Sequence, residues 1–173
     1  MTNTTDGSNR LSATVAALIS SASVFVPIAM SLSTTPSPNH PRIFVWYSLL
    51  RQPSFKPPDW LFPVAWTGIE VSLAVSAYRL LRSRPTVARA RALGLWCANI
   101  LLIGGWSRLF FGRRNLAQST VGAAALTCTS IAYISQTRKV DKLAARAAAP
   151  LVGWVAFATI LTASIWALNA KRR

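Results

Sequence analysis

Two tryptophans and one glutamate are the residues of this chain best suited to bind or react with a ligand, because each lies inside a long apolar stretch. Trp66 and Glu70 are four positions apart, so in a helix they share one face. Trp154 lies in another apolar stretch. An indole ring offers a flat surface for stacking against a flat ligand, and a carboxylate inside an apolar stretch must face protein, water or a ligand, or be protonated. These residues predict a binding pocket.

Glu70 has two interpretations that the sequence leaves open. In the structural one, its carboxyl group pairs with Asn99, with a serine such as Ser72, or with a bound water molecule. In the functional one, it contacts a ligand or accepts a proton below Trp66, since acids within membrane segments are commonly functional.

Other kinds of site are excluded by what the chain lacks. His40 is the only histidine and lies in a loop, so no nucleophile–base pair and no cluster of histidine and cysteine metal ligands can form. A hydrolytic site with two carboxylates is also excluded, because the remaining acids lie outside the apolar stretches: Asp6, Asp59 and Asp141. We therefore predict no metal and no bound cofactor, and no haem ligation.

Two apolar stretches, one of them the stretch that contains Trp154, carry aromatic and small residues at helical spacing. One set is Asn99, Ile103, Trp106 and Phe110, and the other is Trp154, Ala158 and Thr162. Ordinary helix packing explains each set taken singly. Together with Trp66 and Glu70, they predict one shared pocket between helices.

The elements that must position these residues are membrane helices. Hydrophobic residues make up 52% of the 173 residues and charged residues only 13%, about half the share that is usual in a soluble domain. Five apolar stretches are long enough to cross a bilayer, which takes about 20 helical residues. We predict an all-α bundle of five transmembrane helices over residues 11–32, 61–81, 92–111, 116–135 and 147–168. A signal peptide is the alternative for the first stretch, and a retained helix is favoured.

A proline- and tryptophan-rich segment ends the long first loop. Residues 46–66 contain four prolines and three tryptophans. Proline removes a backbone donor and disfavours helix in the residue before it, so this segment is not expected to be an ordinary helix. Aromatic rings favour the membrane surface, and the segment is predicted to form an aromatic lid there.

The rest of the chain fits one membrane domain over residues 11–169, with a disordered N-terminus (1–10) and a basic tail (170–173). The net charge is +15, but the basic residues fall between the apolar stretches. That distribution predicts contacts with anionic lipid headgroups and argues against nucleic-acid binding. Cations are nearly equal on the two sides, so the positive-inside rule gives no orientation. Cys97 and Cys128 lie in apolar stretches and are expected to be buried free thiols.

Three motifs resemble a known family. The run W-Y-x-x-L-x-x-P-S-[aromatic]-x-P-P-x-W-x-F-P-x-A-W-T fits residues 46–67, W-x-x-x-F-F-G fits 106–112, and D-x-L-A-A-R…P-x-x-x-W-x-A-F-A-T fits 141–159. In these motifs the chain resembles the tryptophan-rich sensory protein family, whose animal members are the mitochondrial translocator proteins, or peripheral benzodiazepine receptors. The resemblance covers nearly all of the chain from Trp46 onward.

The resemblance implies five membrane helices, a common dimeric state, and a pocket under the first loop that binds porphyrins and related tetrapyrroles. It implies that Trp66 and Trp154 are the pocket tryptophans, which in the family are tied to oxidative porphyrin breakdown. Four other positions match pocket-lining sites: Tyr47, Pro57, Trp106 and Ala158.

The chain departs from the family pattern in ways that alter the pocket. Glu70 stands where the family commonly has an aromatic residue, and Ile103 and Thr162 replace two asparagines. A basic residue preceded by tyrosine is missing near residue 170, so sterol binding is not expected. Taken together, the expected ligand-binding residues are Tyr47, Pro57, Trp66, Glu70, Asn99, Trp106, Phe110, Trp154 and Ala158.

We therefore predict an integral, multi-pass membrane receptor or sensor for a porphyrin or similar planar hydrophobic ligand. Whether it resides in a bacterial cell envelope or an organelle membrane stays open. Two alternatives remain: a transporter of amphipathic small molecules, and a porphyrin-degrading enzyme that uses Trp66 and Trp154 as redox-active rings with Glu70 as a proton acceptor.

Overall fold

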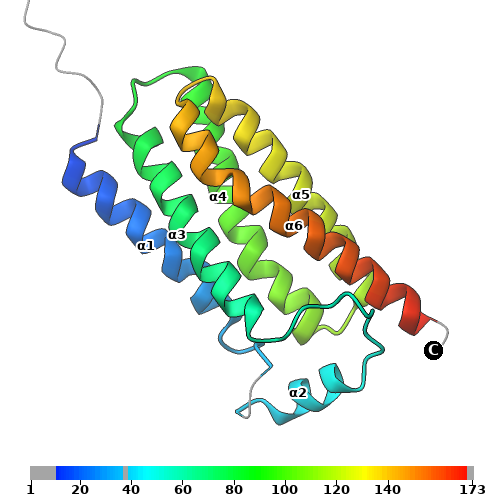
Figure 1. The fold of residues 1–173 in the computed structure, drawn as a ribbon. Coiled ribbons are helices and arrows are strands. Elements are labelled where there is room, and N and C mark those ends of the chain that lie inside the picture. The colour runs from blue at the N-terminus through cyan, green and yellow to red at the C-terminus, as the bar shows by residue number, and fades with distance from the viewer. Residues whose placement is uncertain (1–10, 37–38, 171–173) are drawn as a thin grey trace, which may run out of the picture.

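The computed structural model describes residues 11–36 and 39–170, and every regular element within them is helical (Figure 1). The predicted disordered N-terminus and residues 171–173 of the basic tail lie outside this part of the chain. The elements are α1 (Ala13–Ser31), α2 (Pro41–Ser48), α3 (Leu61–Arg82), α4 (Val87–Ser107), the π-helical η1 (Arg108–Gly112), α5 (Leu116–Arg138) and α6 (Lys142–Asn169).

Four of these helices are long and apolar enough to cross a membrane: α1, α3, α4 together with η1, and α6. The fold is therefore all-helical and membrane-type as predicted, but the count of five spans is matched only in part. The helix that falls short is α5. It has 23 residues, enough length for a crossing, but its serines, threonines and glutamines lower its hydropathy.

The helix α2 corrects the prediction for the proline- and tryptophan-rich segment. Trp46 and Tyr47 lie inside α2, because Pro41 occupies the first turn, where a proline costs no hydrogen bond, and the next proline comes only at Pro53. Residues 49–60 between α2 and α3 are non-helical, as expected from Pro53, Pro57 and Pro58.

Capping side chains fix where four of the long helices begin. Ser12, Thr86, Asn115 and Asp141 each accept hydrogen bonds from backbone N–H groups in the following turn. Such a side chain satisfies a donor that the helix cannot satisfy itself. The first turns of α1, α4, α5 and α6 are therefore set by local sequence.

The helices pack as a bundle in which α3, α4, α5 and α6 surround a shared core, and α1 lies against α3 and α4 (Figure 1). The core holds Leu80, Tyr133 and Leu151, each fully buried. The hydroxyl groups of Ser76 and Tyr133 are 2.7 Å apart and tie α3 to α5 inside it. This pair links two helices through polar groups inside the bundle.

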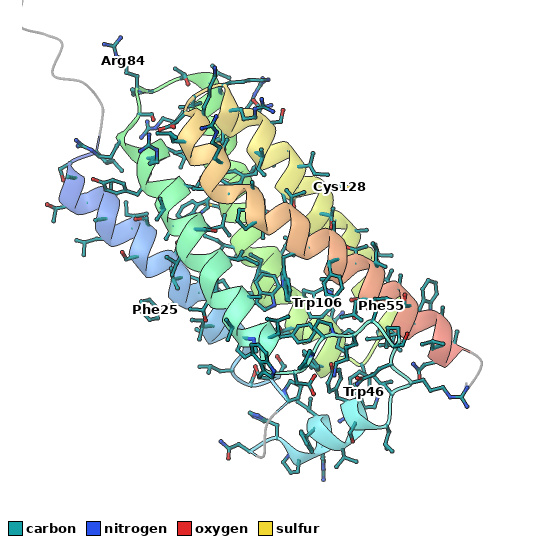
Figure 2. All side chains as sticks on the ribbon, in the orientation of Figure 1. Phe25, Trp46, Phe55, Arg84, Trp106 and Cys128 are labelled. Atoms are coloured by element: carbon teal, nitrogen blue, oxygen red, sulfur yellow. The ribbon has the colours of Figure 1, made fainter. Side chains whose placement is uncertain are left out.

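The outward faces of the bundle are apolar, as a lipid environment requires. Phe25 on α1 points away from the other helices and is two-thirds exposed (Figure 2). Cys97 and Cys128 are free thiols, but both are exposed, so the prediction that they are buried is wrong. The apolar stretches that contain them are helices with one outward face, and the two thiols lie on that face.

Asp141 links two helices at the end of the bundle opposite α2. Its carboxylate accepts hydrogen bonds from the N–H groups of Leu143 (2.8 Å) and Ala144 (3.0 Å) and lies 2.9 Å from the Arg79 guanidinium. Burial acts to raise the pKa of this carboxyl group, but the hydrogen bonds from Ala144, Arg79 and Leu143 outweigh it and hold the pKa below its usual value. The ionised form is therefore favoured in the folded protein.

Replacing Asp141 will separate its two roles. Asp141→Ala should destabilise the fold by about 1–2 kcal/mol, because it removes both the helix cap and the ion pair. Asp141→Asn keeps a capping oxygen, and should lose less than about 1 kcal/mol. Thermal unfolding in detergent measures both.

The stability contributed by the Asp141 carboxylate should decrease at acidic pH. Folding lowers the pKa of the Asp141 carboxyl group. Its contribution to the free energy of unfolding is therefore full above the unfolded-state pKa of about 4, and is lost as the pH falls through the lower folded-state pKa. The stability difference between the native protein and Asp141→Asn should therefore shrink towards pH 3. A difference that stayed constant over this range would contradict the ion pair.

Candidate functional site

An aromatic-lined cavity of about 50 Å³ lies between α3, α4, α5 and α6. Helical spacing brings its walls together, since Phe62 and Trp66 are four apart on α3, and Trp154 and Ala158 are four apart on α6. The lining residues are Phe62, Trp66, Ile103, Trp106, Ala123, Leu126, Trp154, Val155, Ala158, Leu161 and Thr162.

The aromatic rings of the cavity pack edge to face. The ring centroids of Trp66 and Trp154 are 6.4 Å apart with an interplanar angle of 86°, and those of Phe62 and Trp154 are 5.7 Å apart at 69°. Edge-to-face contact is a favourable arrangement for aromatic pairs. Residues from α3 and α6 therefore form one continuous aromatic wall.

Trp106 is held on the side of α4. Its indole Nε1–H donates to the Ser119 carbonyl oxygen at 3.0 Å, and its ring stacks on Phe110 at 5.0 Å. The hydrogen bond fixes the orientation of the indole, because Trp has no other polar group. Trp106 thus joins the wall as an oriented apolar surface.

Trp154 differs from Trp106 in its hydrogen bonding. Its Nε1–H is buried and has no partner among the residues that the structure describes. The only hydroxyl in the cavity lining belongs to Thr162, and it donates to the Ala158 carbonyl at 2.7 Å. A buried donor without a partner costs free energy, and an acceptor on a ligand would recover it.

Four of the nine residues predicted to bind ligand line this cavity: Trp66, Trp106, Trp154 and Ala158. The other five do not belong to its lining: Tyr47, Pro57, Glu70, Asn99 and Phe110. Phe62 was missed by the sequence reasoning, although its position one turn before Trp66 was a usable signal.

A second aromatic group connects the cavity to α2. Trp46, Tyr47, Phe110 and Phe111 pack with Trp106, with ring centroids 4.8–6.4 Å apart. Figure 2 shows Trp46, Trp106 and Phe55 at the same end of the bundle. Burial raises the pKa of the Tyr47 hydroxyl, which is therefore neutral at physiological pH. Tyr47 and Phe110 are thus positioned to support the cavity from its α2 side.

The loop after α2 is fastened to the last turn of α6. The Asn169 side-chain oxygen accepts from the Arg51 N–H (3.1 Å), and its nitrogen donates to the Arg51 carbonyl (2.9 Å). Lys56 forms an ion pair with Asp59 and lies 5.3 Å from the centre of the Tyr47 ring. These contacts hold residues 49–60 across the end of the bundle (Figure 1).

Asn99 locks α4 to α5. Its side-chain oxygen accepts hydrogen bonds from Ser130 (2.7 Å) and Thr129 (3.2 Å), and its nitrogen donates to the Leu95 carbonyl. Hydrogen bonds of this kind stabilise helix pairs in membranes. The amide is fully buried and its polar atoms are already paired, so this geometry gives it a packing role.

Glu70 lies one helical turn beyond Trp66 and is 8% exposed. Neither protein partner expected for it is used, because Asn99 bonds to α5 and the Ser72 hydroxyl donates to the Ile69 carbonyl. Within the described ranges, its carboxyl group has no hydrogen bond or ion pair. Of the partners expected in the structural interpretation, Asn99 and Ser72 are therefore engaged elsewhere.

Replacing Glu70 with glutamine tests the functional interpretation. If the carboxyl group contacts a ligand or takes up its proton, the native protein will change affinity severalfold between about pH 5 and 8, and Glu70→Gln will not. A fluorescence titration at several pH values measures this. Identical profiles in the two proteins would leave Glu70 a structural residue.

The chain is similar in sequence to one protein family and to proteins from bacteria, archaea and animals. The sequence profile of the TspO/MBR family matches residues 20–167. The chain is 34% identical to Protein CrtK of Rhodobacter capsulatus over 72% of this chain and 78% of that protein. It is also 34% identical to the tryptophan-rich protein TspO of Archaeoglobus fulgidus (72% and 80%), and 28% identical to the human translocator protein (72% and 75%).

Proposed function

Because this chain belongs to the TspO/MBR family, we propose that it is a receptor or sensor for a porphyrin or a similar planar hydrophobic ligand, bound in the aromatic-lined cavity. Family membership bears out the resemblance noted in the sequence, and with the apolar helices it makes the chain an integral, multi-pass membrane protein. In this proposal α5 is the fifth membrane span, and a homodimer is the expected assembly.

The observation that carries the proposal is the composition of the cavity wall. Three indole rings and one phenyl ring line it, and the buried N–H of one indole has no partner within residues 11–36 and 39–170. Flat aromatic walls favour flat ligands through stacking, and a single unsatisfied donor favours a ligand with a central or peripheral acceptor. A porphyrin offers both properties.

The aromatic-lined cavity must enlarge to admit a porphyrin. Its volume of about 50 Å³ is far below the roughly 300–1,000 Å³ typical of small-molecule sites. A planar macrocycle can therefore enter only if aromatic side chains rotate or the loop over residues 49–60 moves. We propose that Trp66 and Trp154 separate on binding, since both line the cavity and their rings pack against each other.

Quenching of tryptophan fluorescence by protoporphyrin tests the proposal. The double variant Trp66→Phe, Trp154→Phe should show weaker affinity and less quenching than the native protein. The matched control is Trp60→Phe, Trp166→Phe, which also removes two indoles but at exposed positions outside the cavity. Equal losses in both double variants would contradict the pocket assignment.

Mass spectrometry separates binding from the enzymatic alternative. After aerobic illumination, a receptor should return the porphyrin unchanged relative to a protein-free control. A product that requires the protein, and disappears in the Trp66→Phe, Trp154→Phe variant, would favour oxidative breakdown instead. Uptake of porphyrin into sealed vesicles containing the protein would favour the transporter.

A further inference from the structure

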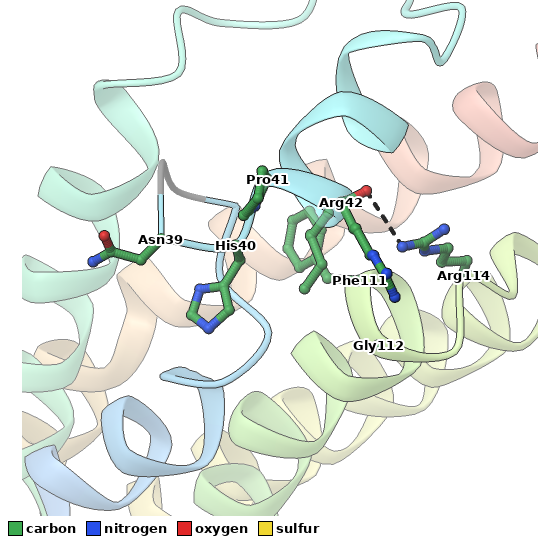
Figure 3. A pocket seen from close by; sticks show the side chains of 8 residues that line it. Asn39, His40, Pro41, Arg42, Phe111, Gly112 and Arg114 are labelled. Atoms are coloured by element: carbon green, nitrogen blue, oxygen red, sulfur yellow. Dashed lines mark hydrogen bonds between the residues drawn. The ribbon is translucent and has the colours of Figure 1, made fainter.

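A second and larger cavity lies beneath the start of α2, where the loop after α1 meets the end of η1 (Figure 3). Its volume is about 460 Å³. None of its lining residues belongs to the aromatic-lined cavity. We call it the α2 cavity, and its lining residues are Asn39, His40, Pro41, Arg42, Ile43, Phe111, Gly112 and Arg114.

Arg114 is fixed in place at the edge of the α2 cavity. It is the one non-glycine residue in the described ranges with a positive φ, 52°. Its guanidinium donates to the Arg42 carbonyl oxygen at 3.3 Å and lies 5.6 Å from the Trp46 ring centre. A strained backbone together with a held side chain is typical of functional positions.

The α2 cavity carries positive charge without a carboxylate to balance it. The two ion pairs among the described residues, Lys56–Asp59 and Arg79–Asp141, involve neither arginine of the cavity. Figure 3 shows the Arg42 and Arg114 side chains on one side of the cavity, with His40 and Asn39 on the other. Two arginines in a lining that contains no carboxylate favour an anion in this cavity.

The chemistry of the lining indicates the kind of anion. Guanidinium groups bind phosphate through paired N–H donors. The lining also includes apolar side chains, those of Pro41, Ile43 and Phe111. The loop after α1 borders this cavity at Gly112, since a Cβ placed on Gly112 would lie 3.3 Å from the methyl group of Thr34, three residues after α1 ends. Exposed apolar side chains precede it on α1, including Ile28.

We propose that the α2 cavity binds the phosphate headgroup of an anionic phospholipid, with Arg42 and Arg114 holding the phosphate and an acyl chain lying along the outward face of α1. Basic pockets beside membrane helices recognise lipid headgroups in this way. This lipid site does not depend on the ligand proposed for the aromatic-lined cavity, because the two sites share no residue.

Native mass spectrometry of the purified full-length protein tests the lipid site. Phosphatidylglycerol should give a one-lipid adduct that phosphatidylcholine does not give at equal concentration. The Arg42→Gln, Arg114→Gln variant should weaken that adduct about tenfold or more, because two charge-assisted contacts are lost. The matched control is Arg84→Gln, Arg113→Gln, which removes the same charge from outside the cavity lining and should keep the adduct.

A single variant and a competition with inorganic phosphate complete the test. The single variant Arg42→Gln should also weaken the adduct, and because the Arg42 side chain makes no described contact, folding should be unaffected. Inorganic phosphate at millimolar concentration should displace the lipid only weakly. Equal adducts in the cavity variant and its control would overturn the proposal, and so would equal binding of the two lipids. Full displacement by inorganic phosphate would also overturn it, because it would indicate a site for the free anion.

Discussion

A Trp154→Phe variant will bind protoporphyrin roughly tenfold to a hundredfold more weakly than the native protein, which corresponds to about 1–3 kcal/mol. Two losses combine in this figure. The indole wall beside Trp66 and Phe62 becomes smaller, and the buried Nε1–H that has no described protein partner is removed. Fluorescence or absorbance titration of the porphyrin measures the affinity.

The chain contains a matched control for this substitution. The Nε1–H of Trp96 is also buried without a described partner, but Trp96 packs in the core and does not line the cavity. Trp96→Phe should therefore leave porphyrin affinity within about twofold, while its effect on stability resembles that of Trp154→Phe. If both variants lose affinity equally, the loss reflects general loosening of the bundle, and the role of Trp154 is refuted.

Gly104→Ala is expected to destabilise the protein by about 1–3 kcal/mol. An added Cβ at Gly104 would lie 2.7 Å from both Cβ and Sδ of Met30 on α1. The Met30 Cβ is attached directly to the backbone, so α1 must move away from α4 to make room. Small residues at such crossings permit close helix packing in membranes. Thermal unfolding in detergent or nanodiscs measures the change.

Replacing the neighbouring Gly105 with alanine is not expected to destabilise the protein. A Cβ on Gly105 would meet nothing within 4 Å, so Gly105→Ala adds no clash. Since alanine favours helix over glycine by about 1 kcal/mol, this variant should be as stable as the native protein or more so. A similar loss in both variants would show that the α1–α4 crossing is less tight than described.

The sequence predicted the helical architecture well because apolar length is a strong signal for membrane helices. It also predicted the helix α5, over 116–135 against Leu116–Arg138, but this helix is not apolar enough to count among the four candidate spans. Polar side chains lower its hydropathy, and one of them, Ser130, bonds to Asn99 of α4. The small helix α2 was missed because the prolines that follow it dominated the pattern, while Pro41 sits at a position that helices accept.

The site was predictable to the extent that helical spacing and motifs fix it. Trp66, Trp106, Trp154 and Ala158 line the aromatic-lined cavity because their helices present these faces inward. Asn99 shows the limit of this reasoning: it lies one turn before Ile103, but its partners come from α5, and no single-helix pattern reveals them. The α2 cavity was not foreseen either, since it joins residues about 70 positions apart in the sequence.

The double hydrogen bond between Asn169 and Arg51 has a practical consequence. It works as a latch, so the loop that covers the bundle end cannot swing outward without disturbing the final turn of α6. A fluorescent label attached to the last turn of α6 would lie beside that latch and bias how often it opens. Labels for ligand measurements therefore belong at the start of α1, at the opposite end of the bundle.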